Sequence, residues 1–356
     1  MRRILFTLEV PAGRGGMEVV AAKVACLFKT TQNVGVEFFM FDEGEDKGSS
    51  TDWVGGTKVT LSKSDIRNGK VRHCLNLWRL TNKIRCFKPD IIITLNTVVC
   101  LTSRRAIKLA GSKAKLVTWM HLPPAERYRP YYLKLADHHL AISKEIKKQL
   151  IDIGVDDKDI DVIFNPVTKS DTTITRPIQT KFLYIGRTHY EDQKRLKDMF
   201  EACALLEGEW SLDIVGDGND KLVCQNYAQE LNIADNITWH GWKNNPWEYT
   251  INNIKEVSAL LLTSDFEGFP LILLEALSHG IYCIASDCVS GPKEIIIPGV
   301  NGALYPPRDI EALRQAMQTV VSGAELPSHE IIKNSVEELY DEKFIAHIGE
   351  VLNKLN

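Results

Sequence analysis

The chain has 356 residues, more than one hydrophobic core usually supports, so its length predicts two domains. Hydrophobic residues make up 44% of it and charged residues 25%, which excludes a disordered protein, and no apolar stretch is long enough to span a membrane. The net charge of −3 hides an asymmetry, because residues 1–170 carry +10 and residues 171–356 carry −13, so the basic half should favour an anionic partner.

The sequence favours a protein of the cytoplasm. Its eight cysteines are scattered without CxxC pairs and mostly in apolar surroundings, which is typical of reduced thiols. The first residues, MRRILFTLEV, contain a charged pair and a short apolar run that Glu9 interrupts. They predict a first strand and not a signal peptide.

Short apolar runs that predict β-strands alternate with helical patterns along both halves. The predicted strands are residues 2–10, 34–41, 90–96, 115–121, 138–143, 161–167, 180–187, 210–217, 236–242, 257–264 and 281–287. Repeated βαβ units predict two parallel-sheet α/β domains, with a linker in the threonine-rich stretch 165–180. Because ligands of such sheets bind beyond the carboxyl ends of the strands, the turns that follow strands are the candidate sites.

The first of these turns lies within LEVPAGRGGMEVV, residues 8–20. It is not a dinucleotide fingerprint, because Glu18 stands where the third glycine belongs, and no Gly-Lys-Ser/Thr of a P-loop follows. Two interpretations stay open. The amides of Gly15 and Gly16 approach a phosphate or a sugar at a helix start, or the chain needs glycine there for a tight turn.

The stretch YIGRTHYEDQKRLKDMF, residues 184–200, opens the second half with cations beside a strand end and a helix start. Gly186 and Arg187 end the predicted strand, and Lys194 and Arg195 precede the helix. Cations at a helix start are unfavourable against the helix dipole, so their presence favours an anion site. The forked donors of arginine suit a diphosphate.

Three other turns allow both a structural and a functional interpretation. DIVGDGND, residues 213–220, forms a pocket wall or a plain turn. ITWHGWKNNPW, residues 237–247, surrounds His240 with tryptophans that either face a base or sugar or belong to the core. His121 follows a strand of the first half and is either structural or directed at the crevice between the domains.

The stretch SDFEGFPLILLEALSHG, residues 264–280, contains a helix start that suits an anion. Pro270 fits the first helical position, and Gly280 fits the helix end. The amides of Gly268, Phe269 and Leu271 would point at a ligand, where the helix dipole favours negative charge.

Two glutamates flank this helix start. Glu267 and Glu275 would repel an anion, so they fit as acceptors for hydroxyl groups on either side of a phosphate. One side can be a ribose and the other a hexose, so the spacing fits a sugar nucleotide.

Together these residues resemble a known family, the retaining GT-B glycosyltransferases. EGFPLILLE is similar to the Glu-x7-Glu element of that family, and YIGR…QK resembles its paired arginine and lysine. GRGGMEVV, AISKEIKKQL, VIFNPV, IVGDG and SGPKEIIIPGVNGALYPP also fall where the family has comparable segments. The resemblance covers nearly the whole chain, and by overall likeness it is greatest to enterobacterial enzymes of lipopolysaccharide core assembly.

The resemblance implies an architecture and a reaction. It implies two Rossmann-like domains that face a central cleft: an acceptor-binding domain over residues 1–168 and a nucleotide-sugar-binding domain over 169–335. A C-terminal helix, residues 336–356, would cross back to the first domain. The implied reaction transfers galactose from UDP-galactose to a glucose of the lipopolysaccharide outer core in an α-1,6 linkage, with retention of configuration.

The resemblance also implies roles for the charged residues of the second half. Arg187 and Lys194, beside Gly186, would bind the diphosphate and stabilise its charge as it leaves. Glu275 would accept hydrogen bonds from the ribose, and Glu267 would hold hexose hydroxyls. Many relatives place the lysine closer to the arginine, so the choice between Lys194 and Arg195 stays open.

The other roles concern uncharged groups. The backbone of Gly268, Phe269, Pro270 and Leu271 would surround the sugar and phosphate, and Trp242, in segment 240–245, would lie near uracil. From the first domain, the Gly15–Gly16 turn would close over the diphosphate, and His121 would lie near the transferred sugar.

No metal or other cofactor is expected. Charge on the leaving UDP would be neutralised by Arg187, Lys194 and a helix dipole. Asp159 and Asp161 in DKDID precede a strand, and we expect them in a solvated loop. No carboxylate is an obvious nucleophile for a double displacement, so the family suggests front-face attack with retention.

The basic half has a candidate partner. ERYRPYYLK, residues 126–134, and SRRAIKLAGSKAK, residues 103–115, could dock on the anionic inner face of the inner membrane, where a lipopolysaccharide acceptor is held, or they form a solvated face. Nucleic acid is not expected, because the acidic second half would repel it.

Three alternatives stay open. A glucosyltransferase of lipopolysaccharide or capsule assembly that uses UDP-glucose would share every motif. A UDP-sugar 2-epimerase would release UDP without an acceptor, and a non-catalytic binder of sugar nucleotides would release none.

Overall fold

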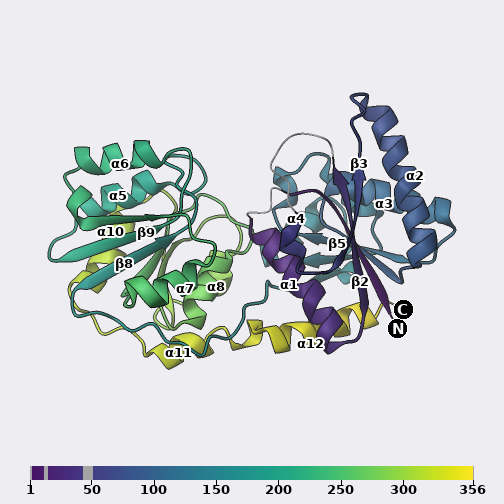
Figure 1. Cartoon of the computed structure of the whole chain (residues 1–356). Helices are drawn as coiled ribbons and strands as arrows, with labels where there is room; N and C mark the ends of the chain where they lie inside the picture. Colours follow the sequence, from purple (N-terminus) through teal and green to yellow (C-terminus); the bar gives the residue numbers. More distant parts are fainter. Residues whose placement is uncertain (1, 12–14, 43–50, 356) are drawn as a thin grey trace. The chain divides into compact units, whose positions relative to one another are not determined.

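The computed structural model describes residues 2–11, 15–42 and 51–355 (Figure 1). The chain divides into two compact units. The first comprises Met1–Pro166 with Asp341–Asn356, and the second comprises Val167–Tyr340.

The first unit contains a parallel sheet of seven strands in the order β3-β2-β1-β4-β5-β6-β7. The strands are β1 (Arg3–Glu9), β2 (Gly35–Asp42), β3 (Lys58–Lys63), β4 (Ile91–Thr94), β5 (Lys115–Met120), β6 (His138–Ala141) and β7 (Ile160–Val162). The helices are α1 (Gly16–Thr31), α2 (Gly69–Phe87), α3 (Thr97–Ala110), α4 (Lys144–Asp152) and α12 (Asp341–Asn353). The central strands are apolar on both faces, because helices cover a parallel sheet on both sides.

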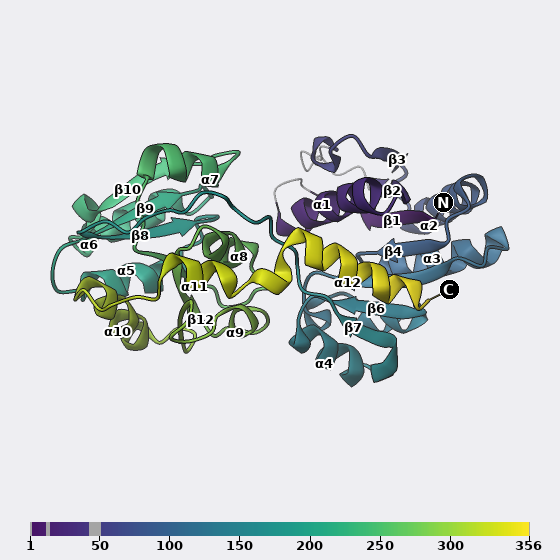
Figure 2. The same cartoon turned by 90° about the horizontal axis from the view of Figure 1, so that it is seen from below.

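The C-terminal helix α12 belongs to the first unit and packs beside α1 (Figure 2). Phe344, Ile348 and Leu352 are buried along one of its faces. Asp341 at its start pairs with Lys23 of α1 at 2.8 Å. The Gln32 side chain, just after α1, donates to the Ile345 carbonyl at 2.8 Å.

The second unit contains a parallel sheet of six strands in the order β10-β9-β8-β11-β12-β13. The strands are β8 (Thr180–Ile185), β9 (Trp210–Val215), β10 (Ile237–Gly241), β11 (Ala259–Leu262), β12 (Tyr282–Ser286) and β13 (Gly302–Tyr305). The helices are α5 (Leu196–Ala204), α6 (Lys221–Glu230), α7 (Pro246–Tyr249), α8 (Leu271–Ser278), α9 (Pro292–Ile295), α10 (Ile310–Val321) and α11 (His329–Asn334). Its core includes Phe182, Tyr184, Leu212 and Ile214, all buried.

The predicted pattern of alternating strands and helices is confirmed, with two strands missed. Both missed strands lie at a sheet edge, and neither is an apolar run: β3 alternates polar and apolar residues between two exposed lysines, and β13 has only four residues.

The stretch expected to hold the interdomain linker, residues 165–180, contains the boundary between Pro166 and Val167, and its later part is hydrogen-bonded along the second unit. The Val167 amide donates to Leu339 at 2.9 Å, and the Ile174 amide donates to His279 at 3.0 Å. Thr175 forms a bridge with Glu256. The segment is polar because it runs over the surface of this unit.

Among the described residues, none of the helices combines the length and the apolar composition needed to cross a membrane.

Candidate active site

Both sheets reverse their strand order at one point, between β1 and β4 in the first unit and between β8 and β11 in the second. At such a switch point the loops beyond the carboxyl ends of the two strands leave a crevice, which is the usual ligand site of an open α/β sheet. In the second unit these loops are the segment after β8, residues 186–195, and the segment after β11, residues 263–270.

Backbone and side-chain hydrogen bonds hold these two loops together. The Asp265 amide donates to the Gln193 carbonyl at 2.9 Å, and the Gln193 side chain donates to the Phe266 carbonyl at 3.1 Å. The buried Thr263 hydroxyl donates to the Lys194 carbonyl at 2.7 Å. Lys194 is therefore fixed by a strand end that lies about seventy positions later in the chain.

Lys194 and Glu267 form an ion pair at the switch point. The Lys194 Nζ lies 2.6 Å from Glu267 Oε1, and the two side chains are only 15% and 10% exposed. A charge pair with so little water around it interacts more strongly than a surface pair. The structure thus brings together the cation and the carboxylate that the sequence had placed in separate motifs.

Arg187 lies in the same loop after β8 as Lys194 and is exposed. Its guanidinium donates to Gln193 Oε1 at 3.3 Å, and its carbonyl accepts from the Tyr184 hydroxyl at 2.7 Å. Gly186 allows a close approach of two backbones, because a Cβ on the neighbouring Gly216 would lie 1.8 Å from the Gly186 carbonyl oxygen. The loops after β8 and β9 can meet only without side chains at these positions.

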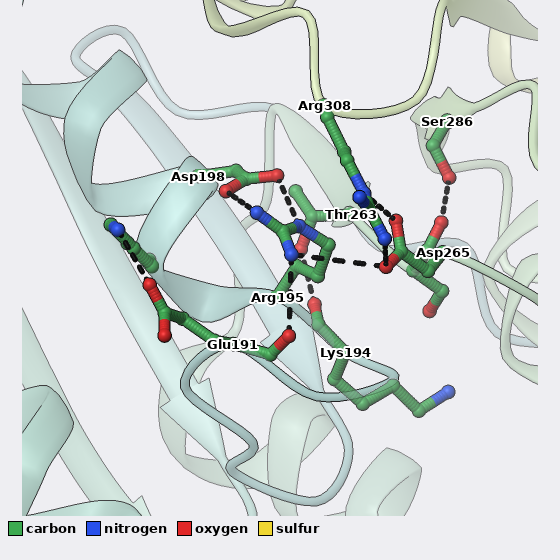
Figure 3. Close-up of polar contacts among 10 residues, drawn as sticks. Glu191, Lys194, Arg195, Asp198, Thr263, Asp265, Ser286 and Arg308 are labelled. Carbon is green, nitrogen blue, oxygen red and sulfur yellow. Dashed lines mark hydrogen bonds and ion pairs between the residues drawn. The ribbon is translucent and has the colours of Figure 1, made fainter.

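Arg195 has a different environment from Lys194 (Figure 3). Its guanidinium contacts both carboxylate oxygens of Asp198, at 2.7 and 2.9 Å, and lies 3.8 Å from Asp265. This hydrogen bonding to Asp198 raises the pKa of the Arg195 guanidinium. Arg308 forms a second forked contact with Asp265, at 2.9 and 2.7 Å. Arg195 is committed to this internal network, whereas the Lys194 side chain extends away from it.

The helix α8 begins one residue later than expected. Pro270 is its N-cap residue and not its first helical residue, and the helix ends before Gly280, whose φ is +78°. The segment 289–291 covers the preceding turn: the Ser290 hydroxyl donates to the Gly268 carbonyl at 2.7 Å, and a Cβ on Gly291 would lie 2.6 Å from Pro270. Because Phe269 and Pro270 are buried, this turn can offer a ligand its backbone and little else.

Glu275 lies inside α8 and is half-buried. Its Oε2 accepts a hydrogen bond from the indole Nε1 of Trp247 at 2.7 Å. The sequence pointed to Trp242 in the aromatic segment and not to Trp247. Trp242 is 47% exposed just beyond the end of β10, whereas Trp247 is 9% exposed in α7.

His240, between the predicted aromatic residues, is fixed by side chains of the second unit. Its Nε2 lies 2.6 Å from Asp213 Oδ1, and its Nδ1 lies 2.9 Å from the Tyr249 hydroxyl. Both ring nitrogens are therefore engaged within the unit, which favours the structural interpretation of this histidine.

The Gly15–Gly16 turn lies at the start of α1 in the first unit, and both glycines are exposed. Gly13 of the same motif lies outside the described residues. Gly15 is the N-cap residue, and a Cβ on it would lie 2.7 Å from the Glu18 carboxylate. Glu18 is buried in the first helical turn, where a negative charge complements the helix dipole.

His121 follows β5 in the first unit and is buried, with 7% of its surface exposed. Burial, together with a smaller effect of the nearby Arg127 charge, lowers the pKa of its imidazole to about 3. Its ring lies 4.4 Å from that of Trp119. Among the described residues, no group forms a hydrogen bond with its Nε2. A buried polar atom of this kind is suited to a ligand hydroxyl or a water molecule.

The expected solvated loop with Asp159 and Asp161 is only partly right. Asp159 ends a short 3-10 helix, but Asp161 lies in strand β7 and contacts His138 Nε2 at 2.8 Å. The described part of the chain contains no cluster of three histidine, cysteine or acidic side chains that could hold a metal ion.

Sequence reasoning missed two side chains of this site, Gln193 and Trp247. Gln193 bridges Arg187 to the loop after β11, and Trp247 contacts Glu275. Both lie inside stretches that the sequence had singled out, YIGR…QK and ITWHGWKNNPW, but nothing in the sequence showed their contacts, because Phe266 and Glu275 come from a later segment.

Two protein families match the chain. The family "Glycosyl transferases group 1" matches residues 174–337, and "Glycosyltransferase Family 4" matches residues 14–170. The two matches correspond to the second unit and to most of the first.

Two curated relatives match along nearly the whole chain. The lipopolysaccharide 1,6-galactosyltransferase of Escherichia coli K12 is 41% identical over 98% of this chain and 98% of its own. The enzyme of the same name from Salmonella typhimurium LT2 is 37% identical with the same coverage.

Solved structures show the same fold. The apo form of the lipopolysaccharide outer core galactosyltransferase WaaB has a TM-score of 0.92 and 36% identity, covering 99% of this chain and 100% of its own. Anabaena Alr3699/HepE in complex with UDP and glucose has a TM-score of 0.79, with 99% and 100% coverage. At 16% identity, this second likeness concerns the fold alone.

Proposed function

The chain belongs to the GT-B glycosyltransferases, in the family of the lipopolysaccharide 1,6-galactosyltransferases, and from this premise we propose that it transfers galactose from UDP-galactose to a glucose of the lipopolysaccharide outer core in an α-1,6 linkage. The observation that carries the proposal is the full-length likeness to the Escherichia coli enzyme. The site at the β8/β11 switch point has the charges that such a reaction needs.

Arg187 and Lys194 bind the diphosphate in this proposal. Breaking the bond between the sugar and the phosphate builds negative charge on UDP, so cations fixed beforehand stabilise the transition state more than the bound donor. Lys194 is held in place through its carbonyl by Thr263 and through its ammonium group by Glu267. Arg195 is not assigned to the diphosphate, because its donors are occupied by Asp198.

Glu267 holds hydroxyls of the transferred hexose. Its Oε1 is paired with the Lys194 ammonium, so on donor binding Lys194 would also contact a phosphate while Glu267 accepts from the sugar. An ammonium group has three donors and can serve both partners. The pair thereby links recognition of the sugar to neutralisation of the leaving group.

The remaining donor contacts follow the same assignment. Glu275 accepts hydrogen bonds from ribose, Trp242 lies against uracil, and the backbone of residues 268–271 and Gly186 surrounds the phosphate and sugar. From the first unit, the Gly15–Gly16 turn contacts the diphosphate. His121 contacts the transferred sugar as a neutral hydrogen-bonding group, because its pKa of about 3 keeps it unprotonated at neutral pH.

We further propose retention by front-face attack and no requirement for a metal ion. A double displacement needs a carboxylate that can reach the anomeric carbon, and the assignment above uses Glu267 for hydroxyl recognition. Arg187, Lys194 and the amino end of α8 supply positive charge to the diphosphate. Analysis of the anomeric configuration of the product tests the first part, and activity in EDTA tests the second.

The basic first half supports a peripheral association with the inner face of the inner membrane. Tyr128 and Tyr131 are 67% and 54% exposed. The Arg129 guanidinium lies over the rings of Tyr128 and Tyr132, at 4.8 and 5.8 Å. Amphipathic rings and cations on one surface suit a bilayer with anionic lipids. Sedimentation with anionic but not zwitterionic vesicles, weakened by salt, is the expected result; equal sedimentation with both would refute the association.

One assay tests the reaction as a whole. UDP release is measured from UDP-galactose and UDP-glucose, in EDTA, with and without truncated core lipopolysaccharide. Release from UDP-galactose that requires the acceptor supports the proposal. A preference for UDP-glucose would assign the chain to a glucosyl transfer, acceptor-independent release would support an epimerase, and no release would support a binder.

A further inference from the structure

Trp247 contacts the candidate ribose-binding carboxylate directly. Its indole Nε1 donates to Glu275 Oε2 at 2.7 Å, and only 9% of the residue is exposed. An indole N–H donates a single hydrogen bond in the plane of the ring, so this bond restricts where the Glu275 carboxylate can lie.

The same indole contacts the C-cap residue of α8, one turn further along. The Trp247 ring stacks on His279, with centroids 4.9 Å apart and planes 28° apart. Glu275 and His279 are four positions apart, so their side chains lie on the same face of the helix. Trp247 therefore spans one helical turn, with its N–H on the carboxylate and its ring face on the imidazole.

His279 is itself fixed by the start of the second unit. Its Nδ1 lies 2.9 Å from the Ser170 hydroxyl and 3.1 Å from the Thr172 carbonyl, and its own carbonyl accepts from the Ile174 amide at 3.0 Å. Burial lowers the pKa of His279, so the ring is neutral at physiological pH. The imidazole is thus a rigid support for the stacked indole.

The backbone around Trp247 is constrained as well. The Asn245 side chain accepts from the Glu248 amide at 3.2 Å and caps α7, and Pro246 occupies its first turn. A single π-helical segment, η6 (Thr250–Ile254), follows directly, with the Thr250 hydroxyl donating to the Pro246 carbonyl at 2.8 Å. Isolated π-helical turns occur frequently at functional sites.

We propose that Trp247 is a positioning residue for the donor nucleotide: its indole N–H and its stack on His279 fix the Glu275 carboxylate in the orientation that accepts the ribose hydroxyls of a uridine diphosphate. This inference rests on the proposed function, because it needs Glu275 to bind ribose. A carboxylate oxygen accepts more than one hydrogen bond, so the Trp247 contact is compatible with a ribose contact.

The test is the affinity for UDP, measured by calorimetry without any turnover. Trp247→Phe keeps an aromatic ring against His279 and removes the N–H donor. We expect UDP affinity and the donor KM to worsen about tenfold, the lower end of what the loss of an orienting partner costs at metal sites. The KM for the acceptor and kcat should change little. Trp210→Phe is the matched control, because Trp210 is also buried in this unit, at 5% exposed, and lies in its core.

A double-mutant cycle separates positioning from direct binding. In a Glu275→Ala background, Trp247→Phe should have no further effect on UDP affinity, because both changes remove one function. An undiminished effect in that background would overturn the inference and assign Trp247 to a direct nucleotide contact. Wild-type UDP affinity in Trp247→Phe, with Glu275→Ala weakened, would overturn the inference and leave the proposed function intact.

Two further outcomes complete the design. Unchanged UDP affinity in Glu275→Ala would overturn the ribose role and the inference with it. If Trp247→Phe does not fold, replacement of Trp247 alone by benzothienylalanine retains the ring shape and removes only the donor. Loss of UDP affinity in that variant supports the inference, and wild-type affinity refutes it.

Discussion

The carboxyl edges of the two sheets share a topology and differ in charge. In the second unit, whose sequence is acidic overall, this edge gathers Arg187, Lys194 and Glu267 around the loops after β8 and β11. In the first unit, whose sequence is basic overall, the same edge has two glycines, a buried Glu18 and a neutral His121. Net charge therefore describes the outer surface of each unit, and the loops at the switch point determine its site chemistry.

The largest expected effect is the loss of kcat when a charge is removed from the carboxyl edge of the second unit. Lys194→Ala removes the cation proposed to face the leaving diphosphate, so kcat should fall by about a hundredfold to a thousandfold, as for loss of a donor that stabilises transition-state charge. Steady-state kinetics provides the measurement. Lys197→Ala is the control, because Lys197 pairs with Glu191 at 2.6 Å on the nearby surface. A fall shared equally by both variants would contradict the assignment.

The next effect separates Arg195 from Lys194. Arg195→Ala leaves the Asp198 carboxylate, whose side chain is 5% exposed, without its forked partner, so the free energy of unfolding should drop by about 3 kcal/mol. Urea denaturation measures this drop. Arg314→Ala is matched in geometry, since Arg314 contacts Glu311 three positions earlier, but that pair is at the surface and its loss should be much smaller. Equal losses would mean that Arg195 is not structural.

The buried His121 of the first unit predicts a pH effect on stability. The pKa of His121 is lowered to about 3, below the ordinary value, so the unfolded chain binds the proton more readily as pH falls. The stability that the unprotonated His121 contributes to the folded chain is fully present above about pH 6.5 and is lost as the pH falls toward the pKa of the folded state. Between pH 7 and pH 5 the loss in unfolding free energy is about 2 kcal/mol. His121→Gln should reduce the slope of unfolding free energy against pH, measured in urea. An unchanged slope would mean that His121 does not titrate differently in the two states.

The smallest expected effect is the loss of kcat on substitution of Arg187. Arg187 is exposed and has one 3.3 Å contact with Gln193, so Arg187→Ala should lower kcat about tenfold. UDP affinity should fall by less, because charge on the leaving group is greatest in the transition state. Kinetics and calorimetry on the same preparation compare the two. Equal losses would assign Arg187 to ground-state binding of the diphosphate.

Much of the fold was predictable from the sequence, because a buried parallel strand is a short apolar run whatever it pairs with. Strands β3 and β13 were missed because neither is an apolar run: β3 alternates Lys58, Thr60 and Ser62 with apolar residues, and β13 has only four residues, two of them glycine and alanine. The helix begins at Leu196, directly after Lys194 and Arg195 as expected, but Arg195 takes a left-handed conformation with φ of +47°. Nothing local to an arginine predicts that conformation.

The sequence by itself determined the two-domain parallel α/β architecture, the loops that follow the strands and the motifs EGFPLILLE and YIGR…QK. Only the tertiary structure decided which cation faces which partner. Lys194 and Arg195 are neighbours with the same charge, but Thr263 and Glu267 hold the first at the switch point, and Asp198 holds the second inside a network. Trp247 likewise meets Glu275 only because α7 and α8 pack together. The spacing of residues along the chain predicts helices and strands. Which side chains pair depends on strand order and burial, and these are set only when distant segments pack together.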